Sequence, residues 1–312
     1  MYKPDIVITH YPCSDGATSE AVIRKFYNDD SIEYIKGDYG DAKRAGFIDE
    51  LIDKVRGKHV LMADFSYKAK EIQGLITSAE SIVILDHHIT AQSELENFKL
   101  ESFHTVNEVE ELLKEQKCVA LFDMDECGSS LTWQFFYPDT SIPPFVDRIK
   151  DIDLGRHNMP RSTDFLWFTR AIPINGASYI PFLDIPTEDD LTPFLDKGVV
   201  IRQYVETTAD RIIENAIEGE YEGFTFKYVT TDYAFCSEIS SRFVKEGFDL
   251  GITGYFTKSS FGLSIRSREG VDCSILAKAW GGGGHKQASG VNIQFEDAAE
   301  FMETIHNNII WK

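Results

Sequence analysis

The side chains best suited to chemistry in this chain follow an apolar run. Four aliphatic residues, Ile82 to Leu85, lead directly into Asp86, His87 and His88. An unbroken aliphatic run favours a strand that is buried on both faces of a parallel sheet, and ligands bind at the carboxyl ends of such strands. The pattern therefore predicts that a carboxylate and two imidazoles lie at the mouth of a sheet.

The same pattern recurs at three other apolar runs, each of which delivers an acid or an imidazole to the predicted sheet edge. These are His10 after residues 5–9, with Cys13 and Asp15 close behind, Asp64 after residues 59–63, and Asp123 after residues 118–122. A lone aspartate after a strand is more often a helix cap, which is our interpretation of Asp123. The convergence of the remaining groups predicts an active site.

Carboxylates that are packed together are costly unless a proton or a cation compensates the like charges. The predicted set is His10, Asp15, Asp64, Asp86, His87 and one further acid from Asp147, Asp151 or Asp153. A bound metal is the simplest explanation for such a set, and mixed His and Asp ligands favour Mn²⁺, Fe²⁺, Co²⁺ or Zn²⁺ over Ca²⁺. Two such ions about 4 Å apart would bind a phosphoryl group, activate water and stabilise a leaving oxygen.

The charge composition of the chain limits the kinds of substrate that it can bind. The chain has 312 residues, with 51 acidic against 31 basic side chains and a net charge of −20. Release of counterions from a long polyanion therefore cannot be the main source of affinity, so we expect a short substrate and no long duplex nucleic acid.

The sequence also predicts a location. No apolar run approaches the roughly 18 residues that span a membrane, and the N-terminal residues lack the pattern of an export signal. The five cysteines are scattered, without a Cys-x-x-Cys pair, as is typical of a reducing compartment. We expect a cytoplasmic protein without a membrane partner, and homodimer formation is left open.

Segment patterns predict an α/β fold in which a parallel-sheet domain (1–187) is joined by a helical linker (188–218) to a smaller α+β domain (219–312). The helices expected in the first two parts cover 15–27, 45–55, 68–78, 128–136 and 191–216, with a further strand at 31–35. In the last part we expect strands at 224–229, 251–256, 261–267 and 289–294, and helices at 234–245, 273–279 and 297–310.

Four motifs carry a resemblance to a known family. They are Ile-Val-Ile-Leu-Asp86-His87-His88, His10-Tyr-Pro-Cys13-Ser-Asp15-Gly16, the intervening Asp64, and Asp151-Ile-Asp153-Leu. Together they are similar to the DHH phosphoesterase superfamily, which includes nanoRNases (oligoribonucleases), cyclic-dinucleotide phosphodiesterases, RecJ-type exonucleases, and pyro- and polyphosphatases. The resemblance extends over nearly the whole chain.

The resemblance implies a role for each residue. It assigns His10, Asp15, Asp64, His87 and Asp151 as metal ligands, with Asp64 bridging two metals and Asp153 as the alternative to Asp151, and His88 and Asp86 as the catalytic pair. In the family motif, the histidine is followed by two aspartates that are separated by one residue. In this chain Cys13 takes the place of the first aspartate, and it lies one residue closer to the histidine than that aspartate does in the family. Cys13 is therefore either a softer ligand, which would favour Zn²⁺ or Fe²⁺, or a spectator beside one firmly held metal.

The C-terminal part carries a second resemblance. Gly281 to Gly284 and His285, framed by Ser264-Ile-Arg266-Ser and by Lys286-Gln-Ala-Ser-Gly290, are similar to the DHH-associated C-terminal domain. By that resemblance, Arg266 and His285 bind the end of the substrate distal to the metals. The loop of Gly282, Gly283 and Gly284 would cradle it.

We therefore predict a phosphodiesterase that uses one or two Mn²⁺ ions, with Zn²⁺, Fe²⁺ or Co²⁺ as alternatives. The expected substrates are short oligonucleotides and linear or cyclic dinucleotides, which it would hydrolyse to mononucleotides. The alternatives are an exopolyphosphatase or pyrophosphatase, which needs no base stacking, and a nucleotide sensor without catalysis. Phe165, Trp167, Phe168 and Trp280 are candidate stacking platforms, with core packing as the equally weighted alternative.

Overall fold

The computed structural model describes residues 1–300, 303 and 309–311. The chain forms two compact units, Met1–Ile201 and Arg202–Lys312. The boundary between them falls inside the long helix α10 (Thr192–Ile213), which the sequence predicts as residues 191–216. Each unit has its own sheet and its own core, and each is described by itself.

The first unit contains a five-stranded sheet in which every pairing is parallel. Its order is β2-β1-β3-β4-β5, with β1 Ile6–His10, β2 Glu33–Gly37, β3 His59–Ala63, β4 Ser81–Asp86 and β5 Cys118–Phe122. The aliphatic runs of the sequence form the central strands, and all six residues of β4 are buried. The predicted parallel α/β fold is therefore confirmed.

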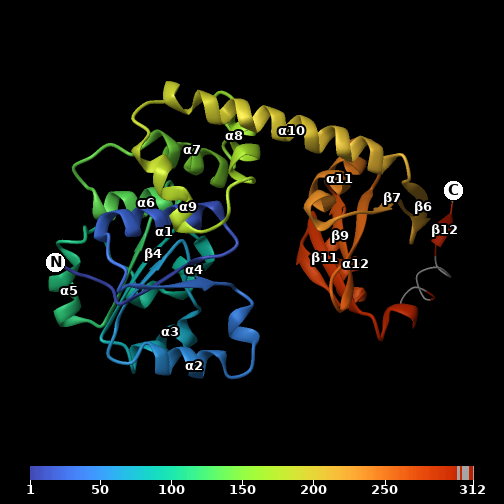
Figure 1. Ribbon diagram of the computed structural model, residues 1–312. Coiled ribbons are helices and arrows are strands. Elements are labelled where there is room, and N and C mark those ends of the chain that lie inside the picture. The colour runs from blue at the N-terminus through green and yellow to red at the C-terminus, as the bar shows by residue number, and fades with distance from the viewer. Residues whose placement is uncertain (301–302, 304–308, 312) are drawn as a thin grey trace. The chain divides into compact units, whose positions relative to one another are not determined.

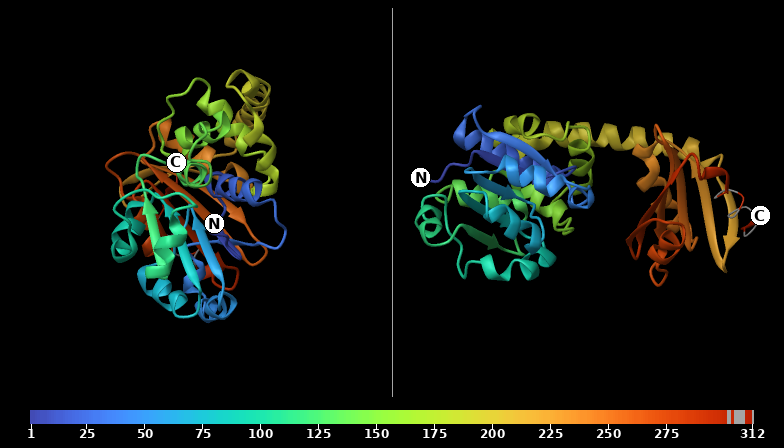
Figure 2. Two further views of the ribbon diagram at one scale, coloured as in Figure 1. Left: turned by 90° about the vertical axis from the view of Figure 1, so that its left-hand side faces the viewer. Right: turned by 90° about the horizontal axis from the view of Figure 1, so that it is seen from below.

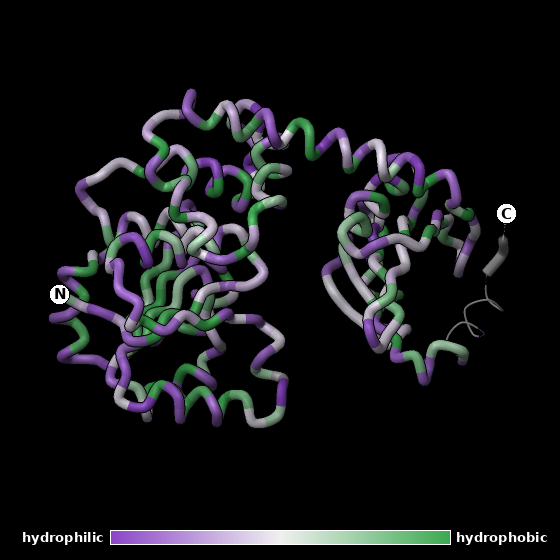
Figure 3. The backbone as a smooth tube through the Cα atoms, in the orientation of Figure 1, coloured by the Kyte–Doolittle hydropathy of each residue, from purple (hydrophilic) through white to green (hydrophobic). Residues whose placement is uncertain are grey.

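Alternate residues of these strands enter two different cores. Val7, Leu61 and Val83 pack on one face with helices α1 (Ser14–Tyr27) and α6 (Gly128–Phe136). The residues next to them along the chain face the other way, toward α2 (Phe47–Lys54) and α3 (Ala69–Ile76). Figures 1 and 2 show the helices on both faces, and Figure 3 shows the hydrophobic strands between them.

The rest of the first unit consists of helices and loops. The further helices are α4 (Ile89–Glu94), α5 (Val109–Glu115), α7 (Pro144–Asp153), α8 (Ser162–Thr169) and α9 (Gly176–Tyr179), with short 3₁₀ turns at Asp41–Lys43, Glu96–Phe98, Ile180–Asp184 and Asp189–Leu191. Helices α4 and α5 have no counterpart in the sequence prediction. Among the described residues, no helix has both the length and the hydropathy that crossing a bilayer requires.

The second unit contains a seven-stranded mixed sheet in the order β10-β11-β9-β8-β7-β6-β12. Its strands are β6 Ile217–Tyr221, β7 Phe224–Thr230, β8 Leu250–Phe256, β9 Ser260–Ser267, β10 Gly283–His285, β11 Ala288–Gln294 and β12 Ile309–Trp311, and its helices are α11 Tyr233–Lys245 and α12 Cys273–Ala279. Only β7 and β8 pair in parallel, and α11 is the crossover between them. Strands β6, β10 and β12 are not predicted from the sequence.

The prediction of a helix over 297–310 is confirmed in part, because residues 298–300 and 303 are helical and residues 309–310 are not. Residues 301–302 and 304–308 lie outside the described residues. Ile309 and Ile310 belong to β12, which pairs antiparallel with β6.

The aromatic residues proposed as stacking platforms are mostly core. Phe165, Trp167 and Phe168 are at most 8% exposed. Trp280 packs against the hydrophobic cluster that includes Phe226 and Ile265, with its ring 5.4 Å from that of Tyr221. The core-packing interpretation therefore holds for the first three, because their rings have no surface left for a base.

Candidate functional site

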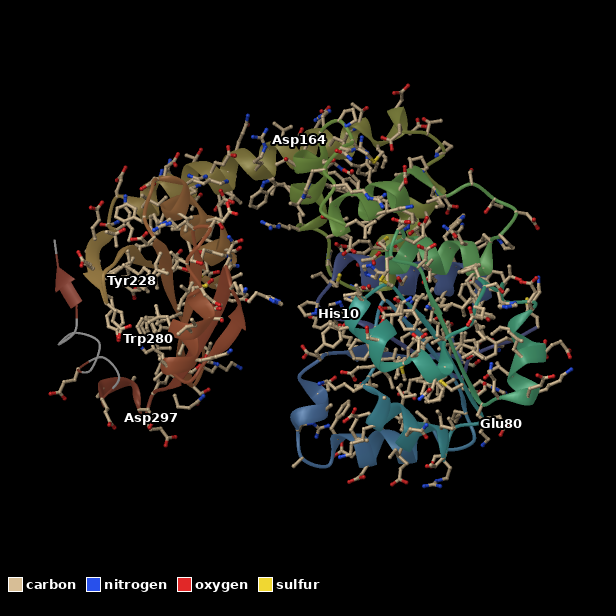
Figure 4. The ribbon with its side chains drawn as sticks, turned by 180° about the vertical axis from the view of Figure 1, so that it is seen from behind. His10, Glu80, Asp164, Tyr228, Trp280 and Asp297 are labelled. Atoms are coloured by element: carbon tan, nitrogen blue, oxygen red, sulfur yellow. The ribbon has the colours of Figure 1, made fainter. Side chains whose placement is uncertain are left out.

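The carboxyl ends of three adjacent strands deliver the candidate site. Strand β1 ends at His10, β3 ends one residue before Asp64, and β4 ends at Asp86. Figure 4 labels His10 at this end of the sheet and Glu80, which precedes β4, at the opposite end. The parallel pairing of β1, β3 and β4 thus brings residues together that lie far apart in sequence.

Asp64 is the centre of the group. Its Oδ1 lies 3.1 Å from Nε2 of His87, and its Oδ2 lies 3.7 Å from Nδ1 of His10. The side chain is 1% exposed, and Oδ2 has no hydrogen-bond partner among the described residues. A buried carboxylate oxygen without a partner is costly, so this oxygen faces a position that a cation would fill.

Asp64 also has an uncommon backbone conformation. Its φ of +57° lies in the left-handed region, which Asp and Asn enter more readily than most residues. The chain turns at this residue as soon as β3 ends, and the turn keeps the carboxylate at the sheet edge. Strain of this kind is concentrated at functional sites.

The carboxylate of Asp15 is held by the start of helix α6. Its carboxylate is completely buried and accepts hydrogen bonds from the backbone N–H groups of Gly128 (2.6 Å) and Ser129 (2.9 Å) at the start of α6. Its Oδ2 also lies 3.8 Å from Nε2 of His87. Sequence reasoning missed this support from Gly128 and Ser129, although the run of small residues at the start of α6 is visible in the sequence.

The absence of a side chain at Gly128 is also required. A Cβ atom at this position would lie 2.3 Å from Cβ of Asp64 and 2.7 Å from its Cα. The start of α6 therefore approaches β3 so closely that only glycine fits. One residue both positions Asp15 and leaves room for Asp64.

The carboxylates repel one another strongly. Burial, followed by the charges of Asp64 and Asp153, raises the pKa of Asp15 well above its usual value. Burial and Asp64 likewise raise the pKa of Asp153. Burial also opposes the charge of Asp64, but the interactions with His10 and His87 outweigh it and lower the pKa of Asp64.

His87 carries the opposite charge. Burial lowers its pKa, but the hydrogen bond with Asp64 and the charges of Asp15 and Asp153 outweigh burial and raise it to about 9. The protonated imidazole therefore compensates part of the acid cluster. A divalent cation would compensate it more fully and free the imidazole nitrogen as a ligand.

The donor set fits a metal. Three groups have ligand atoms that lie within 4.8 Å of one another: His10 with Cys13 and Asp64, Asp64 with His87 and His88, and Asp15 with His87 and Asp153. The groups overlap at Asp64 and His87, as expected where neighbouring ions share ligands. The unpartnered oxygen of Asp64 supports the same conclusion.

The structure corrects one predicted ligand. Asp153, and not Asp151, lies beside the cluster, with its Oδ2 3.5 Å from Nε2 of His87. Asp151 instead accepts hydrogen bonds from the backbone N–H of Asn158 (2.8 Å) and from the hydroxyl of Ser162. These contacts tie the loop after α7 to the helix, so Asp151 has a structural role in this geometry.

Asp86 supports the two histidines that follow it. Its Oδ1 accepts from the backbone N–H of His87 (2.8 Å) and lies 2.7 Å from Nδ1 of His88, while its Oδ2 accepts from the hydroxyl of Ser66 (3.0 Å). The hydrogen bond with Asp86 raises the pKa of His88. Asp86 is thus a positioning residue, and its bond to Nδ1 leaves the other ring nitrogen of His88 for a ligand.

Cys13 precedes α1 and lies in the group with His10 and Asp64. Its side chain makes no capping hydrogen bond to the helix. Burial and the charges of Asp64 and Asp15 raise the pKa of its thiol. Without a cation, the side chain is therefore a neutral thiol at neutral pH.

Tyr39 is a further residue beside the cluster. Its half-exposed ring lies 5.0 Å from the ring of His10 and 6.0 Å from that of His88, measured between centroids. A pocket of about 320 Å³ is lined by Tyr39, Ser66, Tyr67, Lys68 and Thr90, among others. No sequence pattern singles out Tyr39, because a lone tyrosine after a short strand is common.

The second unit places its predicted residues on one sheet face. Arg266 on β9 and His285 on β10 are both in register with Ala288 on the strand between them. Residues opposite one another in a ladder share a face, so the side chains of Arg266 and His285 flank a small residue. The guanidinium of Arg266 donates to Ser237, Ser264 and the carbonyl of Ile265, all neutral oxygens, which leaves its charge available to an anion.

The glycine run differs from its predicted form. Gly283 and Gly284 belong to strand β10, and the N–H groups of Gly281 and Gly282 donate to carbonyls of Lys278 (3.1 Å) and Ala277 (2.7 Å) at the end of α12. Those two amides end the helix and are not available to a ligand. Gly283 is opposite Gly290, so this part of the sheet face has no side chains.

Two tyrosines lie on or beside the same sheet face. Tyr255 on β8 is in register with Gly262 on β9. Gly262, Ser264 and Arg266 are alternate residues of β9 and share a face, so Tyr255 lies on the same face as Arg266. A Cβ on Gly262 would lie 2.2 Å from the ring of Tyr255, so the missing side chain makes room for the ring. Tyr233, at the start of α11, is 69% exposed, and its ring lies 4.9 Å from that of Tyr255.

Comparisons with known proteins identify the fold. No family model matches the chain. A DHH domain from a protein described as a member of a family of ribosomal proteins matches with a TM-score of 0.55 at 11% identity, covering 98% of this chain and 86% of that one. The chain has the fold of a DHH domain. The resemblance in the sequence is therefore confirmed at the level of the fold.

Two more DHH-like structures match over nearly all of this chain. The pGpG-specific phosphodiesterase PggH from Vibrio cholerae has a TM-score of 0.51 at 13% identity, with 96% of this chain and 97% of that chain covered. RecJ from Thermus thermophilus in complex with Mn²⁺ has a TM-score of 0.50 at 10% identity, with 97% and 51% covered. Identities this low establish the DHH fold alone.

One curated relative is similar in sequence. An uncharacterised protein of Acanthamoeba polyphaga mimivirus is 28% identical over 303 residues, which cover 92% of this chain and 67% of the relative. In the DHH fold described here, His10, Asp15, Asp64, His87 and His88 come together as predicted, and Asp151 does not. Their roles as ligands stay predictions.

Proposed function

We propose that the protein is a metal-dependent phosphodiesterase that hydrolyses short oligonucleotides or dinucleotides to mononucleotides. The observation that carries the proposal is the buried carboxylate of Asp64, whose oxygens face His87 on one side and His10 on the other. One oxygen has no partner among the described residues. A shared carboxylate in this position is suited to a pair of ions.

Asp15, Asp64, His87 and Asp153 would hold one ion, and His10, Cys13 and Asp64 the other. Ions bound there would stabilise charge on a phosphoryl group and lower the pKa of water. Mn²⁺ is the expected ion. The Mn²⁺ in the RecJ structure supports this choice by analogy of fold.

His88 would bind the phosphoryl group. Its Nδ1 is held by Asp86, and its raised pKa favours the protonated ring. The second ring nitrogen would then donate a hydrogen bond to a phosphoryl oxygen, which is a charge-assisted contact. Asp86 would fix the orientation of the ring without touching the substrate.

Aromatic groups favour a nucleotide over inorganic polyphosphate. Tyr39 lies beside the histidines, with a pocket of about 320 Å³ next to it. In the second unit, Arg266 and His285 would bind a phosphate and the Tyr255–Tyr233 pair would stack on a base. Polyphosphate has no base, so these rings would serve no purpose in a polyphosphatase.

The test is hydrolysis of a 5′-phosphorylated RNA dinucleotide by the full chain with Mn²⁺, followed by chromatography. We expect mononucleotides to be released, and EDTA to stop the reaction. Asp64→Asn, which keeps the shape and tolerates the left-handed backbone, should lower turnover about 10²-fold or more. Asp53→Asn, at an exposed position on α2, is the matched control and should leave turnover unchanged.

Parallel reactions with polyphosphate and cyclic dinucleotides separate the alternatives. Phosphate release from polyphosphate alone would replace the proposal with a polyphosphatase. Dinucleotide binding without hydrolysis of any substrate, in the wild type with Mn²⁺ bound, would establish a sensor instead.

A further inference from the structure

The two sides of Asp64 present different ligand chemistry. On the side of Oδ1 lie His87, Asp15 and Asp153, which offer one nitrogen and several carboxylate oxygens. On the side of Oδ2 lie His10 and Cys13, which offer a nitrogen and a sulfur. The first set is rich in oxygen, and the second has the only thiol of the described cluster.

Two independent observations indicate a ligand position on the Oδ2 side of Asp64, where His10 and Cys13 lie. The ligand atoms of His10, Cys13 and Asp64 lie within 4.8 Å of one another. The carboxylate oxygen on that side, Asp64 Oδ2, is buried and has no hydrogen-bond partner among the described residues. The arrangement is therefore more than a cysteine that lies near an acid.

Helix capping does not explain Cys13. It occupies the N-cap position of α1, where Ser, Thr, Asp and Asn are preferred because their oxygens accept from the helix. Cys13 makes no such hydrogen bond. A residue that is poor at capping therefore stands where an ordinary cap would stabilise the helix, next to an unpartnered carboxylate oxygen.

Ligand softness then decides which ion each side takes. Thiolates select zinc and similar soft or borderline ions, whereas carboxylates suit magnesium and manganese. Zinc accepts sulfur, nitrogen and carboxylate oxygen in one small site. The two sides of Asp64 should therefore differ in metal preference.

We propose that this centre is an unlike pair, in which His10, Cys13 and Asp64 take a zinc-class ion and Asp15, Asp64, His87 and Asp153 take Mn²⁺ or Mg²⁺. The inference rests on the proposed function, because it concerns the ions that the proposed phosphodiesterase would use. It identifies Cys13 as a ligand. It also predicts that Zn²⁺ displaces Mn²⁺ from the side of His10 and Cys13.

The experiment is a Co²⁺ titration of the metal-free full chain, followed by absorption spectroscopy without substrate. Cobalt replaces zinc in such sites, and a thiolate bound to it gives an intense near-ultraviolet charge-transfer band that nitrogen and oxygen ligands do not give. Because no substrate is present, the result does not depend on whether the protein hydrolyses dinucleotides. Bound cobalt is measured in parallel by equilibrium dialysis.

Three variants make the result specific. Cys13→Ser removes the sulfur while giving α1 a favoured capping residue, so the fold should persist, as circular dichroism would verify. Cys13→Asp replaces the thiolate with a carboxylate. Cys118→Ala, at the start of β5 and thus at the opposite end of the sheet, is the matched control.

We expect the band in the wild type and in Cys118→Ala, and its loss in both Cys13 variants. In competition dialysis, Cys13→Asp should also shift the preference for Zn²⁺ over Mn²⁺ by about tenfold or more, because altering even a residue behind a ligand costs that much affinity. Cobalt binding without the band in the wild type would overturn the proposal. A band that persists in Cys13→Ser, or no cobalt binding at all, would overturn it as well.

Discussion

Asp15 Oδ2 lies 2.6 Å from the backbone nitrogen of Gly128, a residue 113 positions later in the chain. This contact joins the start of α1 to the start of α6 under the candidate metal centre. The free N–H groups at a helix start favour a negative charge, so α6 opposes part of the rise in the pKa of Asp15 that burial causes. The geometry of the centre therefore depends on a residue that is not itself a ligand.

Gly128→Ala should disable the centre without unfolding the protein. The new Cβ would overlap Asp64, where the gap is 2.3 Å, and would push either β3 or α6 away. We expect turnover of the dinucleotide to fall about 10²-fold, as displacements of about 1 Å at an active site do. The control is Gly74→Ala on α3, where the nearest atom is the end of the Ile52 side chain at 3.1 Å. Unchanged turnover in Gly128→Ala would contradict this geometry.

Asp153→Asn and Asp151→Asn should have opposite effects. Asp153 lies in the repulsive cluster, so its neutralisation should raise the melting temperature of the metal-free protein and weaken Mn²⁺ binding. Asp151 accepts hydrogen bonds from Asn158, Met159 and Ser162, so its change should cost about 1–3 kcal/mol of stability and leave Mn²⁺ affinity intact. Calorimetry on both variants decides between the two aspartates. Weakened Mn²⁺ binding in Asp151→Asn alone would restore Asp151 as the ligand.

Arg266→Ala should raise the KM for the dinucleotide and change kcat little. A hydrogen bond to a charged group contributes about 1.5–3 kcal/mol, which corresponds to roughly a tenfold to hundredfold change. Arg268→Ala is the matched control, because Arg268 is already paired with Asp249 at 2.5 Å. Equal effects of the two variants on KM would show that general positive charge, and not Arg266, binds the substrate.

Tyr255→Ala should weaken nucleotide binding, whereas Tyr255→Phe should not. The stacking of one base on an aromatic ring contributes about 1–3 kcal/mol, and phenylalanine keeps the ring. Binding of a non-hydrolysable dinucleotide, measured by calorimetry, is the readout. The exposed Phe256 next to it in β8 provides a control, Phe256→Ala, whose side chain points to the other face of the sheet. If loss of the Tyr255 ring leaves affinity unchanged, this pair is not the platform.

The contribution of Asp249 to stability should depend on pH. Burial raises its pKa, but the bonds from Arg268 and Thr225 outweigh burial and lower the folded-state pKa below the usual 3.8. Its charge therefore stabilises the fold above the unfolded-state pKa, and that stabilisation is lost as the pH falls through the folded-state pKa. Asp249→Asn should destabilise the second unit by about 1–3 kcal/mol at neutral pH. In urea unfolding the difference from wild type should vanish in acid, and a difference that grows in acid would refute this sign.

The sequence predicts the parts of this fold that depend on local pattern. The aliphatic run before Asp86 becomes strand β4, and helices α6 and α12 begin and end where their patterns predict. Parallel pairing then brings His10, Asp64 and His87 to one edge. Short edge strands such as β10 and β12 have no such pattern, because their pairing is decided by partners far along the chain.

The choice between Asp151 and Asp153 could not be made from the sequence. Both are on α7, but residues two apart on a helix point in different directions, and only the packing of α7 shows which one reaches His87. Tyr255 was missed for a related reason. Its importance follows from its register with Gly262, and register is not visible in a single strand.

The left-handed backbone of Asp64 has a consequence for divergence. That conformation admits few residue types, mainly Asp, Asn and Gly, and the contact with Gly128 limits the space further. A related protein that lost catalysis but kept the fold could therefore carry only a few residue types in place of Asp64. Asn or Gly here, with Gly128 retained, would be the mark of a lineage that had turned from hydrolysis to binding.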